Sequence, residues 1–137
     1  MILLGILALA AASAPCDEAA FITSQKANRA DIDVKVQADS QTVETLIAQR
    51  NEIRERLVEL DSMSSAKRQF RSTFNEDYDP RVLRGRDERI GLRIDGLKDE
   101  MAFFEAKRRR LDSEVKEFAA RCAPENFNAR SRETRAQ

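Results

Sequence analysis

A seven-residue repeat of apolar residues runs through the second half of the chain. Two sets of heptad positions, separated by alternating steps of four and three residues, carry mostly apolar side chains. They are Leu83, Ile90, Leu97, Phe104, Leu111 and Phe118 in one set, and Ile94, Met101, Val115 and Cys122 in the other. This spacing keeps one apolar seam facing a partner helix along its whole length. The repeat therefore predicts that residues 81–122 form a long coiled-coil helix.

The first half of the chain continues the repeat and supplies the partner helix. Its seam residues are Ile32, Val36, Val43, Leu46, Ile53, Leu57 and Leu60. Between the halves, residues 71–80 read RSTFNEDYDP, in which Asn, Asp and Pro favour turns and Pro80 disfavours a helical residue before it. We therefore predict an all-α fold, an elongated antiparallel two-helix coiled-coil hairpin. Its first long helix is expected at residues 32–70 and its connecting loop at residues 71–80.

The composition agrees with long helices and a narrow core. Hydrophobic residues make up 42% of the chain and charged residues 35%, with four Gly and three Pro. Few helix breakers favour long helices, whereas this apolar content is low for a large globular core. The net charge is zero, but acidic residues predominate in residues 17–61 and basic residues in residues 62–137. The two arms of a hairpin are therefore expected to attract each other.

One register of the two helices lets two misplaced charges neutralise each other. Asp39 interrupts the seam of the first helix, and Arg108 interrupts that of the second. If the numbers of facing residues add up to 147, these two side chains meet and Leu46 faces Met101. A single charge in an apolar seam is costly, whereas a pair can select one register. We therefore predict a buried ion pair between Asp39 and Arg108.

Two cysteines, Cys16 and Cys122, bracket the helical region. An even cysteine count in an exported chain favours a disulfide within the chain, although each cysteine could instead cross-link two chains. In the register above, Cys122 lies opposite Gln25, too far along a straight helix from Cys16 for a bond. The bridge then requires a helix break between residues 20 and 33. Residues 15–31 are accordingly expected to form a separate N-terminal segment, with room for one short extra helix.

Residues 1–14 form a short apolar leader that reads MILLGILALAAASA. As a helix it would be about 21 Å long, short of the roughly 30 Å hydrocarbon layer, so a signal peptide is the better interpretation. The chain is then exported, periplasmic or secreted, with no stable membrane span after cleavage. An uncleaved leader would instead tether it to the membrane as a periplasmic linker. Residues 123–137 lack periodic apolar residues and are predicted to be a disordered tail.

Several functional classes find no support in the sequence. The chain has no His, and no Gly-rich loop, paired-cysteine motif or nucleophile elbow is present, so no catalytic, cofactor-binding or metal-binding residues are predicted. The basic residues 107–110 are flanked by acidic residues and are not accompanied by an aromatic platform for bases, which argues against nucleic acid as a partner. Asn75, Glu76, Asp77 and Asp79 offer oxygen atoms, but their spacing fits an acidic turn better than a calcium loop.

One face of the second helix is the candidate binding surface. Leu92, Gly96 and Phe103 lie away from the predicted seam, where packing of the two helices gives apolar and small residues no reason to gather. Glycine in an exposed helix costs about 1 kcal/mol relative to alanine, so its presence suggests that another surface comes close. The alternative is that these are ordinary scattered exposed residues.

The sequence as a whole therefore predicts an exported cell-envelope protein that is not an enzyme. Its expected role is protein–protein interaction or structural support, with a protein partner or a second copy docked on the face that carries Leu92 and Phe103. One alternative is a chaperone-like helical clamp for unfolded proteins, and another is the membrane-tethered linker.

Overall fold

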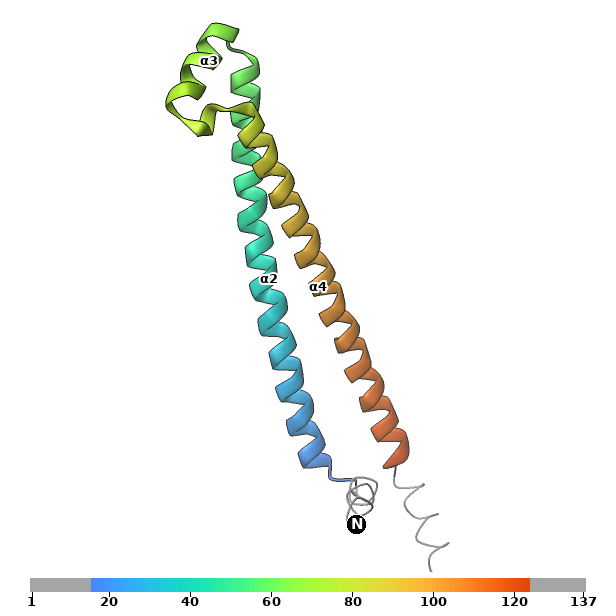
Figure 1. Cartoon of the computed structure of the whole chain (residues 1–137). Helices are drawn as coiled ribbons and strands as arrows, with labels where there is room; N and C mark the ends of the chain where they lie inside the picture. Colours follow the sequence, from blue (N-terminus) through green and yellow to red (C-terminus); the bar gives the residue numbers. More distant parts are fainter. Residues whose placement is uncertain (1–15, 124–137) are drawn as a thin grey trace, which may run out of the picture. The chain divides into compact units, whose positions relative to one another are not determined.

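The computed structural model describes residues 16–123, and this part of the chain is helical without strands. The elements are α2 (Glu18–Asp61), α3 (Ser65–Phe74), the 3-10 helix η1 (Glu76–Tyr78) and α4 (Pro80–Arg121). The long helices α2 and α4 run side by side in opposite directions, with α3 at the chain reversal (Figure 1). The predicted all-α helical hairpin is confirmed. The predictions for residues 1–14 and for most of the tail lie outside the described residues.

Contacts divide the chain into two compact units, which we describe separately. One unit comprises residues 33–105, with the second part of α2, the chain reversal and the first part of α4. Within the described residues, the other unit comprises residues 16–32 and 106–123, where the beginning of α2 meets the end of α4.

The unit of residues 33–105 has a narrow apolar core. Val43, Leu46 and Ile94 form its buried cluster, and three partly buried side chains pack against it, namely Ile90, Leu97 and Met101. Nearer the chain reversal, Leu60 and Leu83 are completely or almost completely buried. All of these residues belong to the predicted heptad positions, so the seam is where the apolar pattern placed it.

The register of this unit differs from the predicted one by one heptad. The numbers of facing residues add up to about 140, as for Leu46 and Ile94 in the buried cluster. Arg50 Nε donates to Asp87 Oδ1 at 2.8 Å, which would be impossible if Arg50 faced Leu97. The predicted sum of 147 is therefore wrong. A slip of seven residues places apolar positions opposite apolar positions again, so the apolar pattern alone does not distinguish the two registers.

The predicted ion pair between Asp39 and Arg108 loses its basis with this correction. In the observed register the position opposite Asp39 is that of Met101. Asp39 and Arg108 also belong to different units, so their pairing is untested. Asp39 Oδ2 is buried and accepts no hydrogen bond from the described residues.

The chain reversal contains more helix than predicted. The first long helix ends at Asp61 rather than at residue 70, because Ser64 starts a new helix by accepting a hydrogen bond from the Lys67 amide. Helix α3 and η1 then occupy most of the expected loop at residues 71–80, and the Asn75 side chain caps η1. Asp79 caps α4 through the Arg81 amide, and Pro80 takes the first helical position, where its missing N–H costs nothing.

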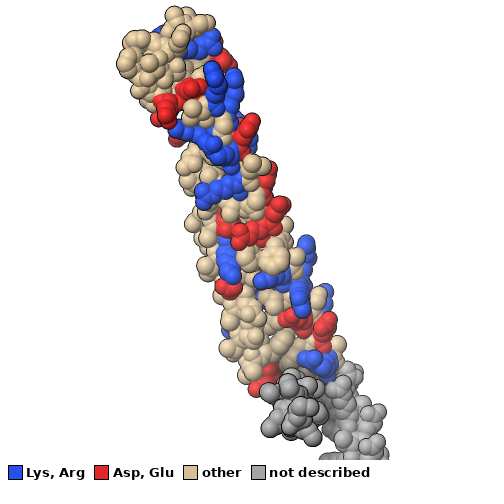
Figure 2. All heavy atoms as spheres, in the orientation of Figure 1, with Lys and Arg blue, Asp and Glu red and all other residues tan. Residues whose placement is uncertain are grey.

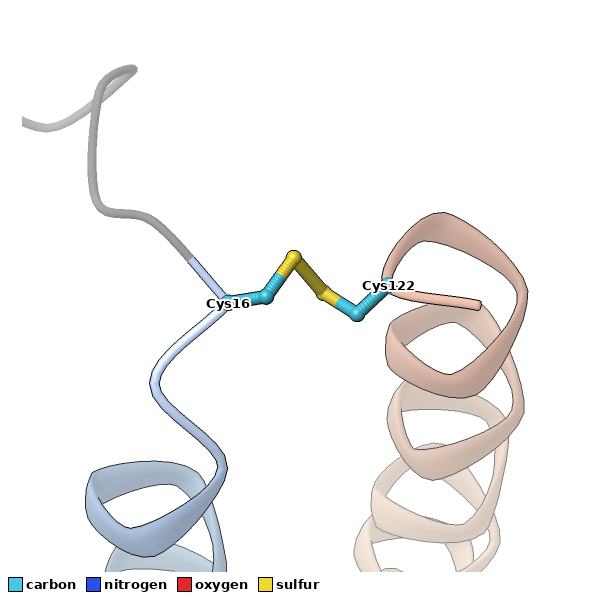
Figure 3. Close-up of a disulfide and its surroundings, with 2 residues drawn as sticks. All are labelled: Cys16 and Cys122. Atoms are coloured by element: carbon cyan, nitrogen blue, oxygen red, sulfur yellow. A yellow bond between two sulfur atoms is a disulfide. The ribbon is translucent and has the colours of Figure 1, made fainter. Parts of the chain in front are cut away.

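A disulfide closes the unit of residues 16–32 and 106–123. Cys16 and Cys122 are bonded, with their Cα atoms 5.6 Å apart, as Figure 3 shows. The rings of Phe21 and Phe118 stack with centroids 4.0 Å apart. Two polar pairs join the same helices: the buried Gln25 donates to Glu114, and Arg29 bonds Asp112 at 2.8 Å. The predicted disulfide within one chain is therefore present.

The separate N-terminal segment at residues 15–31 does not exist as predicted. Helix α2 begins at Glu18, where Asp17 caps it by accepting a hydrogen bond from the Ala20 amide. The break was inferred because the 147 register placed Cys122 opposite Gln25. Since Gln25 instead contacts Glu114, Cys122 lies beside the start of α2. A continuous helix then closes the bridge without a break.

Removing the disulfide should destabilise the hairpin. The cysteines are 106 residues apart, and the chain-entropy model assigns a loop of this length roughly 4 to 5 kcal/mol. We expect the Cys16→Ser/Cys122→Ser double variant to lose up to this much free energy of unfolding in urea titrations. Equal denaturation midpoints for the variant and the oxidised wild type would contradict the assignment, as would a disulfide-linked dimer in non-reducing mass analysis.

Candidate functional site

The predicted partner face lies on exposed α4 surface. Leu92 and Phe103 are 72% and 57% exposed. A Cβ atom added to Gly96 would meet no atom within 4 Å, so no neighbour in the described chain requires glycine there. The three residues follow helical spacing and lie on one side of α4, with Leu92 and Phe103 about 16 Å apart along the axis. We call this surface the α4 face.

A second glycine, which the sequence analysis did not single out, has a clear structural role. A Cβ atom on Gly91 would lie 3.1 to 3.3 Å from the guanidinium of Arg50. Glycine therefore leaves room for Arg50 to cross α4 and reach Asp87. Arg54 Nε lies 3.4 Å from the same carboxylate oxygen. These residues fix the register through one charged contact that is mostly shielded, since the side chains of Arg50 and Asp87 are 30% and 20% exposed.

Arginine partners lower the pKa values of two carboxylates in the unit of residues 33–105. The hydrogen bond from Arg50 lowers the pKa of Asp87, with further attraction from Arg54, although desolvation opposes the shift. The hydrogen bond from Arg86 likewise lowers the pKa of Asp77. Both carboxylates are therefore ionised near neutral pH and act as fixed anionic partners, which is a structural role rather than general acid–base catalysis.

Helix α3 carries a second apolar surface that the sequence analysis missed. Phe70 and Phe74 are 66% and 76% exposed, and their ring centroids lie 5.0 Å apart. The side of α3 that is partly buried is polar, with Arg68, Arg71 and Ser72. Figure 2 shows a largely uncharged surface at the end of the molecule where α3 lies. A shallow hollow of about 450 Å³ beside the rings is lined by Phe70, Arg71, Phe74, Asn75 and Tyr78.

Tyr78 fixes the orientation of α3. The guanidinium carbons of Arg56 and Arg71 lie 5.3 and 5.2 Å from the centroid of its ring, within the range of cation–π attraction. Arg71 also bonds Glu59 of α2, at 3.4 Å. The polar side of α3 is thus attached to the body of the unit, which leaves the aromatic side facing solvent. The run of Phe70, Phe74 and Tyr78 at steps of four was the sequence signal for this cluster.

Three of the four oxygen-bearing side chains of the reversal make structural contacts. Asn75 caps η1, Asp79 caps α4 and Asp77 bonds Arg86. Among residues 16–123, no group of three or more His, Cys, Asp or Glu side chains is arranged to hold a metal ion. None of the helices in this range combines the length and apolar character needed to cross a membrane.

Comparisons with known proteins add no functional assignment. No family model matches the chain, and neither the curated proteins nor the solved structures gave a match.

The Arg50–Asp87 pair should make stability depend on pH. Because folding lowers the pKa of Asp87, its stabilising contribution is present above the pKa of an unfolded aspartate, about 4, and is lost as the pH falls through the folded value. Asp87→Asn should therefore lower the free energy of unfolding at pH 7, and the difference from wild type should shrink below about pH 4. Urea titrations at several pH values measure this. A variant as stable as wild type at pH 7 would contradict it, and Asp99→Asn on exposed α4 surface is the matched control.

Alanine at the two glycines should separate their roles. Gly96→Ala adds a side chain in open space and should stabilise the protein by up to about 1 kcal/mol through helix propensity. Gly91→Ala should gain less or destabilise, because its methyl group displaces the Arg50 guanidinium. Thermal unfolding of the two variants provides the comparison, and an equal gain at both positions would refute the role of Gly91.

Proposed function

We propose that the chain is an exported, non-enzymatic protein-interaction module of the cell envelope. The observation that carries this proposal is the α4 face, on which Leu92 and Phe103 are largely exposed on a long helix of fixed register. Aromatic side chains such as Phe103 bury a large apolar area and contribute strongly to affinity when a partner covers them. The α4 face is therefore the proposed docking surface for a protein partner or a second copy.

Two features support export. The Cys16–Cys122 disulfide is of a kind that forms and persists in oxidising compartments. The apolar leader of residues 1–14 is too short to span a bilayer as a helix and ends in small residues, as the apolar part of a signal peptide does. Sequencing the N-terminus of protein purified from the native host distinguishes a cleaved leader from the membrane-tethered alternative.

A role in binding rather than catalysis is supported by how the polar groups are used. The chain contains no His. The hollow between α2 and α4 near the chain reversal, about 340 Å³, is lined by charged residues that include Asp77 and Arg86. Since these two bond each other, they serve the fold rather than a substrate.

A chaperone-like clamp is the second candidate, and the scattered exposed apolar side chains favour it. Besides Leu92 and Phe103, the exposed large residues include Val34, Ile47 and Val58. Many weak apolar contacts suit unfolded chains better than one structured partner. Suppression of the aggregation of a denatured model substrate would favour the clamp, whereas a complex of fixed stoichiometry would favour the interaction module.

Charge on the α4 face should abolish the complex without unfolding the hairpin. Leu92→Glu/Phe103→Glu places two carboxylates where a partner must exclude water, and each would cost several kcal/mol if buried unpaired. We expect loss of the wild-type complex in sedimentation or cross-linking experiments, with unchanged helicity by circular dichroism. Val58→Glu, at an equally exposed position on α2, is the control and should retain the complex. Association of the double variant at wild-type strength would refute the proposal.

A further inference from the structure

Helix α3 packs with its polar side inward and its apolar side outward. Ala66, Phe70 and Phe74 are exposed, whereas Arg68 and Arg71 on another side are partly buried. An amphipathic helix on a globular protein normally turns its apolar side to the core. The sequence pattern of α3 alone would therefore bury these rings, and the folded chain exposes them.

Contacts at both ends of α3 and along its polar side hold the helix in this orientation. The Ser64 cap fixes the start of α3, and the Asn75 amide bonds the Arg71 carbonyl at its end. Arg71 bonds Glu59 and stacks on Tyr78, so rotating α3 to hide the phenylalanines would break both contacts. The outward rings are thus a property of the folded state, and exposed aromatic groups held in this way mark a surface that binds something.

The charge on this side of α3 is positive. Lys67, Phe70 and Phe74 follow at steps of three and four, so the cation and both rings lie on one exposed side of the helix. The other two basic residues of α3, Arg68 and Arg71, lie on its partly buried side, where Arg71 bonds Glu59. Helix α3 itself contains no acidic residue, so Lys67 supplies the charge on the aromatic side. An anionic surface is therefore the complementary occupant.

The size of this surface favours lipid over another protein. A helix of ten residues is about 15 Å long. A stable protein interface buries about 800 Å² on each partner, which one side of such a helix does not provide alone. A bilayer needs no matched shape, because side chains enter the boundary between headgroups and acyl chains individually.

We infer that α3 docks on the surface of an anionic lipid bilayer. Phe70 and Phe74 enter the boundary between headgroups and acyl chains, and Lys67 lies among the headgroup phosphates. The docking is peripheral and reversible, since a single short helix contributes only a few insertion contacts. It uses a surface separate from the α4 face and does not depend on the proposed protein partner.

A tryptophan reporter tests this inference at the helix itself. The chain contains no Trp, so the fluorescence of a Phe74→Trp variant arises at one site. On addition of vesicles containing phosphatidylglycerol, its emission maximum should move to shorter wavelength, and its quenching by iodide should decrease. Phe103→Trp, a reporter on the α4 face, should show neither change. A local reporter also separates docking by α3 from binding through residues 1–14.

Second substitutions in the Phe74→Trp background identify the contributing groups. Phe70→Ser should weaken partitioning at least tenfold, since it removes the second aromatic ring from the boundary. Lys67→Glu should weaken it at least about fivefold, and vesicles of phosphatidylcholine alone should bind less than anionic ones. Leu92→Ser in the same background should have no effect. Circular dichroism checks that each variant keeps its helicity.

Three outcomes would overturn the inference. The first is an emission maximum of Phe74→Trp that does not change when anionic vesicles are added. If cross-linking at this position then captured a protein, the aromatic side of α3 would be a protein-binding surface instead. The second is an equal shift of both reporters. The third is equal binding to neutral and anionic vesicles, which would remove the charge argument. None of these outcomes bears on the complex formed through the α4 face.

Discussion

The charged contact between Arg50 and Asp87 decides which of two nearly equivalent alignments the long helices adopt. A heptad seam can slip by seven residues and still place apolar residues opposite one another. Such a slip separates Arg50 from its carboxylate and leaves two charges beside the seam, which is costly. Gly91 contributes by leaving space for the guanidinium. The Arg50–Asp87 contact and the absence of a side chain at Gly91 therefore specify the register of the two helices, which the apolar residues alone do not determine.

The same alignment explains the ends of the helical region. In the unit that contains the disulfide, facing residues also have numbers that add up to about 140, as for Phe21 and Phe118 at a sum of 139. Cys122 then lies beside the start of α2, and the bridge closes on an uninterrupted helix. Near the chain reversal, caps and cation–π contacts hold α3 with its aromatic side outward. The unit of residues 33–105 thus carries two separate exposed surfaces, the α4 face and the aromatic side of α3.

The sequence predicted the fold class, the second long helix and the cysteine pair. Heptad spacing and an even number of cysteines indicate these features whatever the register of the two helices. The sequence did not predict the register, since Asp39 with Arg108 and Arg50 with Asp87 are competing ways to pair charges. The expected helix break between residues 20 and 33 followed from that one error. Helix α3 was missed because ten residues give a weak periodic signal, and its orientation depends on contacts of Tyr78 with distant arginines.

The register is tested most directly by nuclear Overhauser contacts between methyl groups of the two long helices. The structure predicts a strong cross-peak between Leu46 and Ile94, which share the buried cluster, and a weaker one or none between Leu46 and the Met101 methyl group, which lies seven residues farther along α4 at the edge of that cluster. A cross-peak from Leu46 to Met101 without one to Ile94 would restore the alternative alignment and contradict this account.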